Sequence, residues 1–294
     1  MSLPSEPFNN VSQADIILRS CDGFDFHVHS VVLSYASPFF RAMFSLPPAE
    51  IDKSHPIIPI SEPARLIDRF LRIWYPGAEM LADFDDFNEL QSLIELTLSK
   101  YDIQSVAPIF KHHLRRYIQQ NCVGVFAVAC SRGWADVAHD AAKESLKVNF
   151  FSLVQDTTLA QDLRLVSGAN FQALLCYHLE CGRVAAGAGR TLPMAESHAS
   201  WVKCRDCDPY NNGPRSTIVR AWIYVYLDKL TFVLRHDPGA NVQDSMFLKD
   251  ALSVADECVY CQSSAFRDLS VFIQDKYLPA INEAIGKVPL ELVF

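Results

Sequence analysis

The feature that most constrains this chain is a strand–turn–strand pattern near its start, followed at once by two short apolar helices. Residues 14–20 alternate, with Ile16 and Leu18 on one side, as expected of a half-buried strand. Asp22-Gly23 can supply the positive φ values of a tight hairpin turn. The second strand places its apolar side chains on one face: Phe24, Phe26 and Val28. We therefore predict an antiparallel hairpin with one buried face.

The segments that follow continue an α+β pattern. Ser37-Pro38 is typical of a helix start, with proline at the first helical position. A third strand, Ile57–Ile60, is bounded by prolines and suits only the edge of a sheet. Glu62-Pro63 opens a further helix, and Tyr75-Pro76-Gly77 stops it. Its apolar face comprises Leu66, Ile67, Phe70, Leu71 and Trp74.

This order of elements resembles the start of a BTB/POZ domain. Leu66–Pro76 resembles the "L…LLR..YP" segment of fungal BTB proteins, and Leu98–Asp102 resembles the "A.KYD" that opens the last BTB helix. The resemblance runs from about Ala14 to Leu114. It implies a module that binds proteins and catalyses nothing, that self-associates through its first strand and helices, and that presents a groove to a partner. Such partners include cullin-type ubiquitin-ligase scaffolds and transcriptional corepressors. The best residues for a core-plus-interface helix are Phe39, Phe40, Met43 and Phe44.

Helical periodicity predominates from Pro108 to about Gly168. Residues 123–131 and 134–146 are predicted to form a pair of helices joined at Arg132-Gly133, with several alanines that allow close approach. The segments "VFAVACSRGW" and "AHDAAKESL" resemble the helical extension that follows many fungal BTB domains.

The cysteines are the main signal of the C-terminal part. Four of the nine form two Cys-x-x-Cys pairs: Cys204/Cys207, in a polar turn before a helix over 216–235, and Cys258/Cys261, between helices over 244–257 and 263–285. Two-residue spacing lets both thiolates of a pair reach one tetrahedral ion at about 2.3 Å. We predict that Cys204, Cys207, Cys258 and Cys261 together bind one structural Zn²⁺ ion.

Other interpretations of these cysteines stay open. They could be unliganded thiols whose spacing arose by chance. A redox pair would begin a helix within a βαβ unit, and the sequence predicts none around either pair. A disulfide is disfavoured by the reducing compartment that we expect for this chain. His178 and Cys181 share a face of a helix over 170–185 and, like His198, are either further ligands or ordinary core and surface residues. "YHLECGRVA", "WVKCRDC" and "CVYC" resemble a C-terminal pattern of basidiomycete BTB proteins.

Composition limits the possible partners. Half of the residues are hydrophobic, the net charge is −8 and the pI is near 5.6, which argues against a general phosphate-binding surface. The predicted metal ligands are also flanked by acidic residues: Asp206, Asp208, Asp256 and Glu257. A zinc-dependent nucleic-acid-binding transcriptional regulator is thus the alternative function, ranked behind an adaptor. A metalloenzyme ranks last, because four thiolates would close the coordination shell.

No signal peptide is visible, and the longest apolar stretches, 123–130 and 221–227, are too short to span a bilayer. We therefore expect an intracellular protein, cytoplasmic or nuclear, with no membrane partner. Gly187-Ala188-Gly189 is predicted to stop a helix and form a flexible link.

The sequence as a whole predicts an α+β chain. It comprises a BTB/POZ-like domain over 1–112, a helical extension over 113–168 and a helical cysteine-rich domain over 169–294. The predicted function is a non-enzymatic adaptor that acts through protein–protein interaction.

Overall fold

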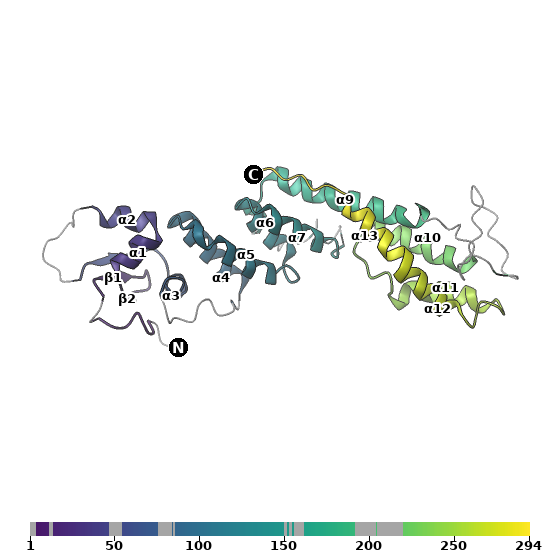
Figure 1. Ribbon diagram of the computed structural model, residues 1–294, viewed down its shortest axis with the longest axis horizontal. Helices are drawn as coiled ribbons and strands as arrows, with labels where there is room; N and C mark the ends of the chain where they lie inside the picture. Colours follow the sequence, from purple (N-terminus) through teal and green to yellow (C-terminus); the bar gives the residue numbers. More distant parts are fainter. Residues whose placement is uncertain are drawn as a thin grey trace. The chain divides into compact units, whose positions relative to one another are not determined.

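The computed structural model describes residues 4–11, 14–46, 55–75, 84, 86–149, 152, 155, 162–191, 204 and 220–294. The chain divides into two compact units, Met1–Tyr117 and Ile118–Phe294, and each is described by itself (Figure 1). The second unit spans both the predicted extension and the predicted cysteine-rich domain. The finer boundaries at residues 112 and 168 stay predictions.

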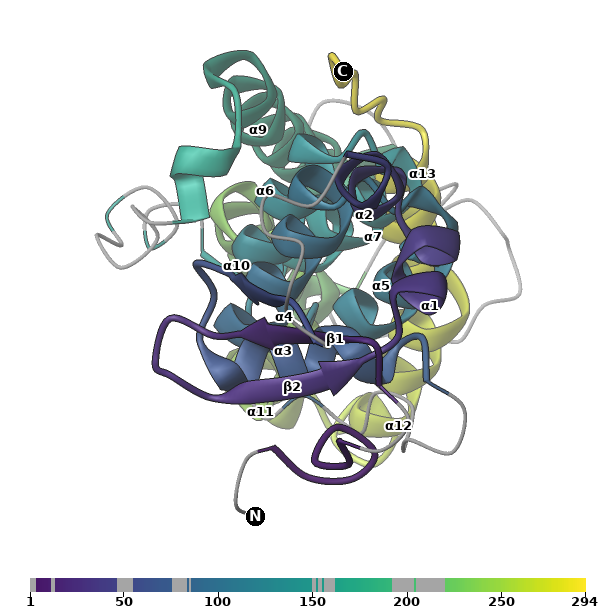
Figure 2. The same cartoon turned by 90° about the vertical axis from the view of Figure 1, so that its left-hand side faces the viewer.

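The first unit contains a three-stranded sheet in the order β2-β1-β3. Strands β1 (Ile16–Arg19) and β2 (Asp25–Val28) pair antiparallel, and Figure 2 shows them side by side. Strand β3 (Ile57–Pro59) lies at the edge, parallel to β1, as its flanking prolines predicted. Gly23 has φ 87°, the left-handed conformation that the hairpin turn requires. The expected alternation is confirmed for the inward side chains Ile16, Leu18, Phe26 and Val28, which are buried. It is wrong for Phe24, which precedes β2 and is 39% exposed.

In the described part of the first unit, the sheet is accompanied by helices α1 (Ser30–Ala36), α2 (Pro38–Phe44), α3 (Ala64–Arg72), α4 (Phe87–Ile94) and α5 (Ala107–Arg116). A π-helical segment, Glu95–Lys100, continues α4, and a 3₁₀ turn, Gln104–Val106, precedes α5. The predicted cap of α2 is confirmed: the Ser37 hydroxyl accepts a hydrogen bond from the Phe40 amide at 3.3 Å. The same hydroxyl donates to the Tyr101 carbonyl at 2.7 Å, which ties α2 to the end of the π-helical segment.

The Lys100-Tyr101-Asp102 segment holds the first unit together. The buried Tyr101 ring lies 4.7 Å from the Phe40 ring and 4.8 Å from the Phe70 ring, centroid to centroid. Lys100 forms an ion pair with Glu62 just before α3. Asp102 adopts φ 51°, which turns the chain toward α5. This motif therefore fixes the core.

The second unit is helical in the residues that the structure describes. Its helices are α6 (Cys122–Ser131), α7 (Ala135–Ser145), α9 (Gly168–Thr191), α10 (Ala221–His236), α11 (Ser245–Asp256), α12 (Ala265–Phe272) and α13 (Leu278–Gly286). A short 3₁₀ turn, Asp162–Leu165, precedes α9, and a π-helical segment, Ile273–Tyr277, joins α12 to α13. The predicted α6–α7 hairpin is confirmed, with Gly133 at φ 67° in its turn.

One sequence prediction for this unit is wrong. Gly187-Ala188-Gly189 does not stop a helix, because α9 runs unbroken to Thr191. A Cβ at Gly182 would lie 2.3 Å from the Arg235 carbonyl oxygen, so the glycine allows α9 and α10 to pack closely. The helix predicted over 263–285 is confirmed, because α12, the segment Ile273–Tyr277 and α13 follow one another without a break, although the central turn is π-helical. The first four residues of the helix predicted over 216–235 lie outside the described residues.

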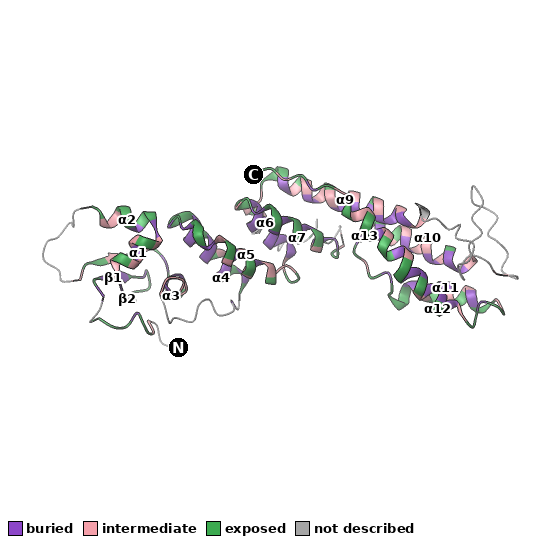
Figure 3. Ribbon diagram, in the orientation of Figure 1, coloured by how far each residue is buried: buried purple, intermediate pink, exposed green. Residues whose placement is uncertain are grey.

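The core of the second unit lies between α9, α10, α11, α12 and α13. Figure 3 marks the buried residues of these helices in purple. Trp222 and Tyr226 of α10 are fully buried there, as is Tyr277. Tyr224 and Phe232, on the other side of α10, are 45% and 73% exposed. The small sheet of the first unit and the helices of the second together make an α+β chain with a helical extension.

Candidate functional site

The end of α11 places two of the predicted metal ligands. α11 ends at Asp256, and the Cys258 amide donates to the Ala255 carbonyl at 3.1 Å. The turn then closes when the Cys261 amide donates to the Cys258 carbonyl at 3.0 Å. These backbone hydrogen bonds form the turn. Because the two cysteines are separated by two residues in it, their thiols lie close together.

Cys204, 54 positions earlier in the chain, joins this pair. Its Sγ lies 3.5 Å from the Sγ of Cys258, and the three sulfurs of Cys204, Cys258 and Cys261 all lie within 4.8 Å of one another. Two sulfurs that each lie about 2.3 Å from one Zn²⁺ ion are separated by at most about 4.6 Å. The 3.5 Å between Cys204 and Cys258 is within that limit. Cys261 is fully buried, whereas Cys204 and Cys258 are half-buried. The cluster thus has an inner and an outer part.

The fourth predicted ligand, Cys207, lies outside the described residues, as does His198. Among the residues that the structure does describe, Cys204, Cys258 and Cys261 are the one group of three or more potential ligands close enough to hold a metal ion. Soft thiolate donors in this number suit Zn²⁺. Zinc itself stays a prediction.

His178 and Cys181 do not join the cluster. His178 is 1% exposed, and its Nε2 lies 3.0 Å from the Val148 carbonyl and 3.3 Å from the Ser145 carbonyl, so it caps the end of α7. Burial lowers the pKa of His178 below its ordinary value. Burial also raises the pKa of the Cys181 thiol to about 11, and Cys181 is hydrogen-bonded to Tyr177. Both side chains therefore serve packing.

A buried ion pair next to the cysteines was not foreseen from the sequence. Arg220, at the start of α10, lies 3.2 Å from the Asp268 carboxylate of α12, and Asp268 also accepts a hydrogen bond from Ser264 at 3.0 Å. The Ala265 amide at the start of α12 donates to the Cys261 carbonyl at 2.8 Å. The pair therefore clamps α10 to α12 seven residues beyond Cys261, about two helical turns. The two charges are 48 positions apart, and no sequence pattern links them.

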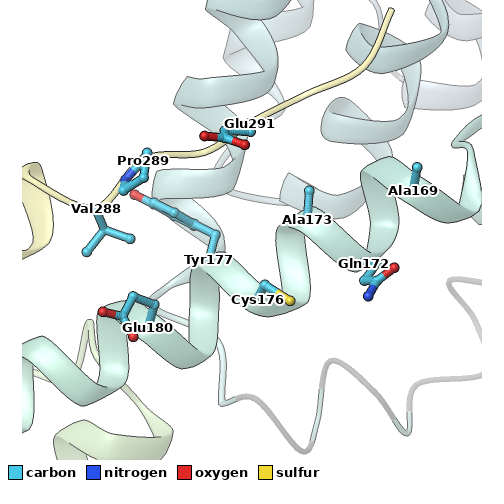
Figure 4. Close-up of a pocket in the computed structure, with 9 residues that line it drawn as sticks. All are labelled: Ala169, Gln172, Ala173, Cys176, Tyr177, Glu180, Val288, Pro289 and Glu291. Carbon is cyan, nitrogen blue, oxygen red and sulfur yellow. The ribbon is translucent and has the colours of Figure 1, made fainter.

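A groove runs along α9 beside the chain segment that follows α13 (Figure 4). Its volume is about 390 Å³, and Figure 4 shows Tyr177 of α9 directed toward Pro289. The segment is fixed further along, where the Asn170 side-chain amide donates to the Val293 carbonyl at 2.9 Å and accepts from the Val293 amide at 2.8 Å. This contact joins residues 123 positions apart and has no signal in the sequence.

The first unit exposes an apolar face on α1 and the start of α2. Val31 and Tyr35, four residues apart on α1, are 70% and 89% exposed, and Phe39, at the start of α2, is 43% exposed. A hollow of about 350 Å³ lies beside them, lined by Val31, Val32, Tyr35, Ala36 and Trp74. Of the four residues predicted for the core-plus-interface helix, Phe40 is buried, Met43 and Phe44 are half-buried and Phe39 is exposed. The core role of Phe40 is confirmed, and the interface role stays a prediction. An exposed apolar cluster of this kind is typical of a protein-binding surface.

Comparison with protein families identifies the first unit. Residues 5–118 match the family model of the BTB/POZ domain. This segment is a BTB/POZ domain. The match covers the three-stranded sheet and helices α1 to α5, and the BTB domain suggests a protein–protein interaction adaptor. No curated protein matches the chain. Among the described residues, no helix is long and apolar enough to cross a membrane.

Proposed function

We propose that this protein is an intracellular adaptor that self-associates through its BTB domain and presents a partner-binding surface. The observation that carries this proposal is the apolar face of α1 and α2, where Tyr35 is 89% exposed. Leaving such side chains in water forfeits about 1.5–3 kcal/mol each relative to burial. A second copy of the domain, meeting the first across a twofold axis, would bury both faces at once.

Light scattering on the full chain tests self-association. We expect the molar mass to rise from that of the 33.0 kDa chain toward twice that value across the micromolar range, where dimers of moderate affinity form. A strict monomer at tens of micromolar would contradict the proposal. Copurification from the native cell would then separate the two partner classes, a cullin-type scaffold and a transcriptional corepressor.

We propose further that Cys204, Cys207, Cys258 and Cys261 bind one structural Zn²⁺ ion. The contact between the Cys204 and Cys258 sulfurs supports this, as does the spacing of each pair. When bound, the ion would supply no chemistry of its own beyond joining chain segments. The four thiols would tie the segment between α9 and α10 to the turn between α11 and α12, and sites of this kind contribute on the order of 10 kcal/mol of apparent binding free energy.

Zinc analysis by mass spectrometry on protein purified without chelator tests this site. One zinc per chain is expected, and Cys258→Ser is expected to lose it and to loosen the second unit while the BTB domain stays folded. Exposed Cys176 provides the matched control, because Cys176→Ser removes a thiol outside the cluster and leaves the zinc content unchanged. Unchanged melting of a variant with all four cysteines replaced by serine would exclude a structural role.

A further inference from the structure

The cysteine cluster is arranged for a second, covalent state. We propose that Cys204 and Cys258 form a reversible disulfide when the protein meets a peroxide, and that this disulfide excludes the metal ion. The release of the metal ion rests on the proposed zinc site, because it assigns that site a mode of regulation. The disulfide itself follows from the positions of the thiols.

The first argument is distance. The two Sγ atoms lie 3.5 Å apart, in van der Waals contact, and a disulfide bond is about 2.05 Å long. The sulfurs therefore need to approach by about 1.5 Å, which side-chain rotation and a small shift of the turn at Cys258 can supply. Neither sulfur belongs to a rigid helix interior, because Cys258 follows the end of α11 and Cys204 lies between α9 and α10.

The second argument is access. Cys204 and Cys258 are half-buried, so a molecule as small as a peroxide can reach them from solution, whereas Cys261 is fully buried. Within the cluster, oxidation therefore begins at Cys204 or Cys258, although Cys21 and Cys176, which lie outside the cluster, are more exposed. The buried thiols of Cys122, Cys130 and Cys181 are shielded by the same criterion, and none of them belongs to the cluster.

The reaction balances with a peroxide as the oxidant. One thiol attacks the peroxide, the O–O bond breaks, and a sulfenic acid and one water form when the oxidant is hydrogen peroxide. The second thiol then attacks the sulfenic sulfur, the S–S bond forms, and a second water leaves. The two thiols lose two protons and two electrons, and the peroxide gains them to form two waters. A dithiol reductant reverses the change by thiol–disulfide exchange.

The consequence for the metal follows from ligand number. A structural zinc site uses four ligands, and a disulfide sulfur is not a thiolate donor. Removing Cys204 and Cys258 leaves two of the four proposed ligands, Cys207 and Cys261, which is half of the set that a structural zinc site uses. The cross-link between the two chain segments survives as a covalent bond, so the second unit keeps its connection while losing its metal.

The test uses the full chain, reduced and loaded with zinc, titrated with hydrogen peroxide. Peptide mapping of the alkylated, unreduced protein is expected to find a disulfide between Cys204 and Cys258, with zinc released in equal molar amount to a chromogenic chelator. Dithiothreitol with added zinc is expected to restore the starting state. Cys204→Ser should prevent the disulfide, whereas Cys176→Ser, which removes an exposed thiol outside the cluster, should leave it unchanged.

The outcomes separate this inference from the zinc proposal. The inference is overturned, even if zinc is bound, if the disulfide found joins Cys258 to Cys261 instead. It is also overturned if peroxide oxidises the exposed Cys21 and Cys176 and leaves the cluster reduced. If the reduced protein holds no zinc but the Cys204–Cys258 disulfide forms, the zinc proposal fails and the covalent part of the inference stands. Peptide mapping of the unsubstituted protein tests whether the Cys204–Cys258 disulfide forms, even if a serine variant does not fold.

Discussion

At the scale of single residues, α9 carries two glycines in contrasting surroundings. Gly182 faces the backbone of α10, and a Cβ there would lie 2.3 Å from the Arg235 carbonyl oxygen. Gly187, little more than one turn further along, has no atom within 4 Å of the position that a Cβ would take. One glycine is thus required by packing and the other is merely tolerated.

Alanine substitution should therefore act in opposite directions at these two positions. Gly182→Ala is expected to lower the free energy of unfolding by about 1–3 kcal/mol, because backbone must move to admit the methyl group. Gly187→Ala is expected to raise it by about 0.5–1 kcal/mol, because alanine loses less entropy in a helix. Urea unfolding measures both. Equal effects of the two substitutions would contradict the close α9–α10 contact.

His178 should make the stability of the second unit depend on pH. Burial lowers the pKa of its imidazole below the ordinary value of 6.5. As pH falls through about 6.5 the unfolded chain takes up a proton before the folded protein does, so the free energy of unfolding decreases. The contribution is fully present above that pH and is lost as pH falls through the folded-state value. His178→Gln should flatten the dependence between pH 5 and 7, whereas His139→Gln, at an exposed position of α7, should not.

At the scale of elements, the sequence predicts those strands and helices whose formation depends on a few neighbouring residues. β1, β2 and α2 were predictable because alternation, a Gly turn and a Ser-Pro cap act within a few residues. The end of α9 was not, because Gly182 and Gly189 pack against α10 and, for Gly189, also against Tyr277, contacts that exist only in the folded unit. The π-helical turn at Ile273–Tyr277 likewise has no periodic signature.

The candidate site shows the same division. The two-residue spacing of Cys258 and Cys261 predicted their shared turn, since neighbouring backbone hydrogen bonds decide it. That Cys204 would approach them was inferred from metal chemistry rather than from any pattern in the chain. The Arg220–Asp268 pair was missed altogether, because two isolated charges 48 positions apart resemble surface residues until the helices pack.

The clamp between α10 and α12 should dominate the stability of this region. Asp268→Ala removes the carboxylate that faces the largely buried Arg220 guanidinium, and losing one partner of a buried pair costs about 3–5 kcal/mol. Calorimetry should show the transition of the second unit at lower temperature and that of the BTB domain unchanged. Glu283→Ala, which breaks the exposed Glu283–Lys287 pair of α13, is the control and should leave both transitions in place.

At the scale of the whole molecule, the two units carry separate tasks. The BTB domain exposes an apolar face, and the second unit holds the cysteine cluster within a helical core.

The exposed apolar face of the BTB domain leads to a prediction about the dimer interface. Replacing Tyr35 or Val31 by Asp should weaken self-association by about 30-fold or more, because losses at interface hot spots reach about 2 kcal/mol. Val11→Asp, at another exposed apolar position of the same unit, should leave the dimer affinity unchanged. Sedimentation equilibrium gives both constants.

Hydrogen exchange of the full chain, compared between dilute and concentrated solutions, tests the central claim most directly, because it locates the interface as well as detecting it. We predict that amides of residues 30–44, which span α1 and α2, exchange more slowly as concentration rises, and that those of α10 to α13 do not change. Exchange that is independent of concentration throughout the BTB domain, or slowing confined to the second unit, would contradict the account.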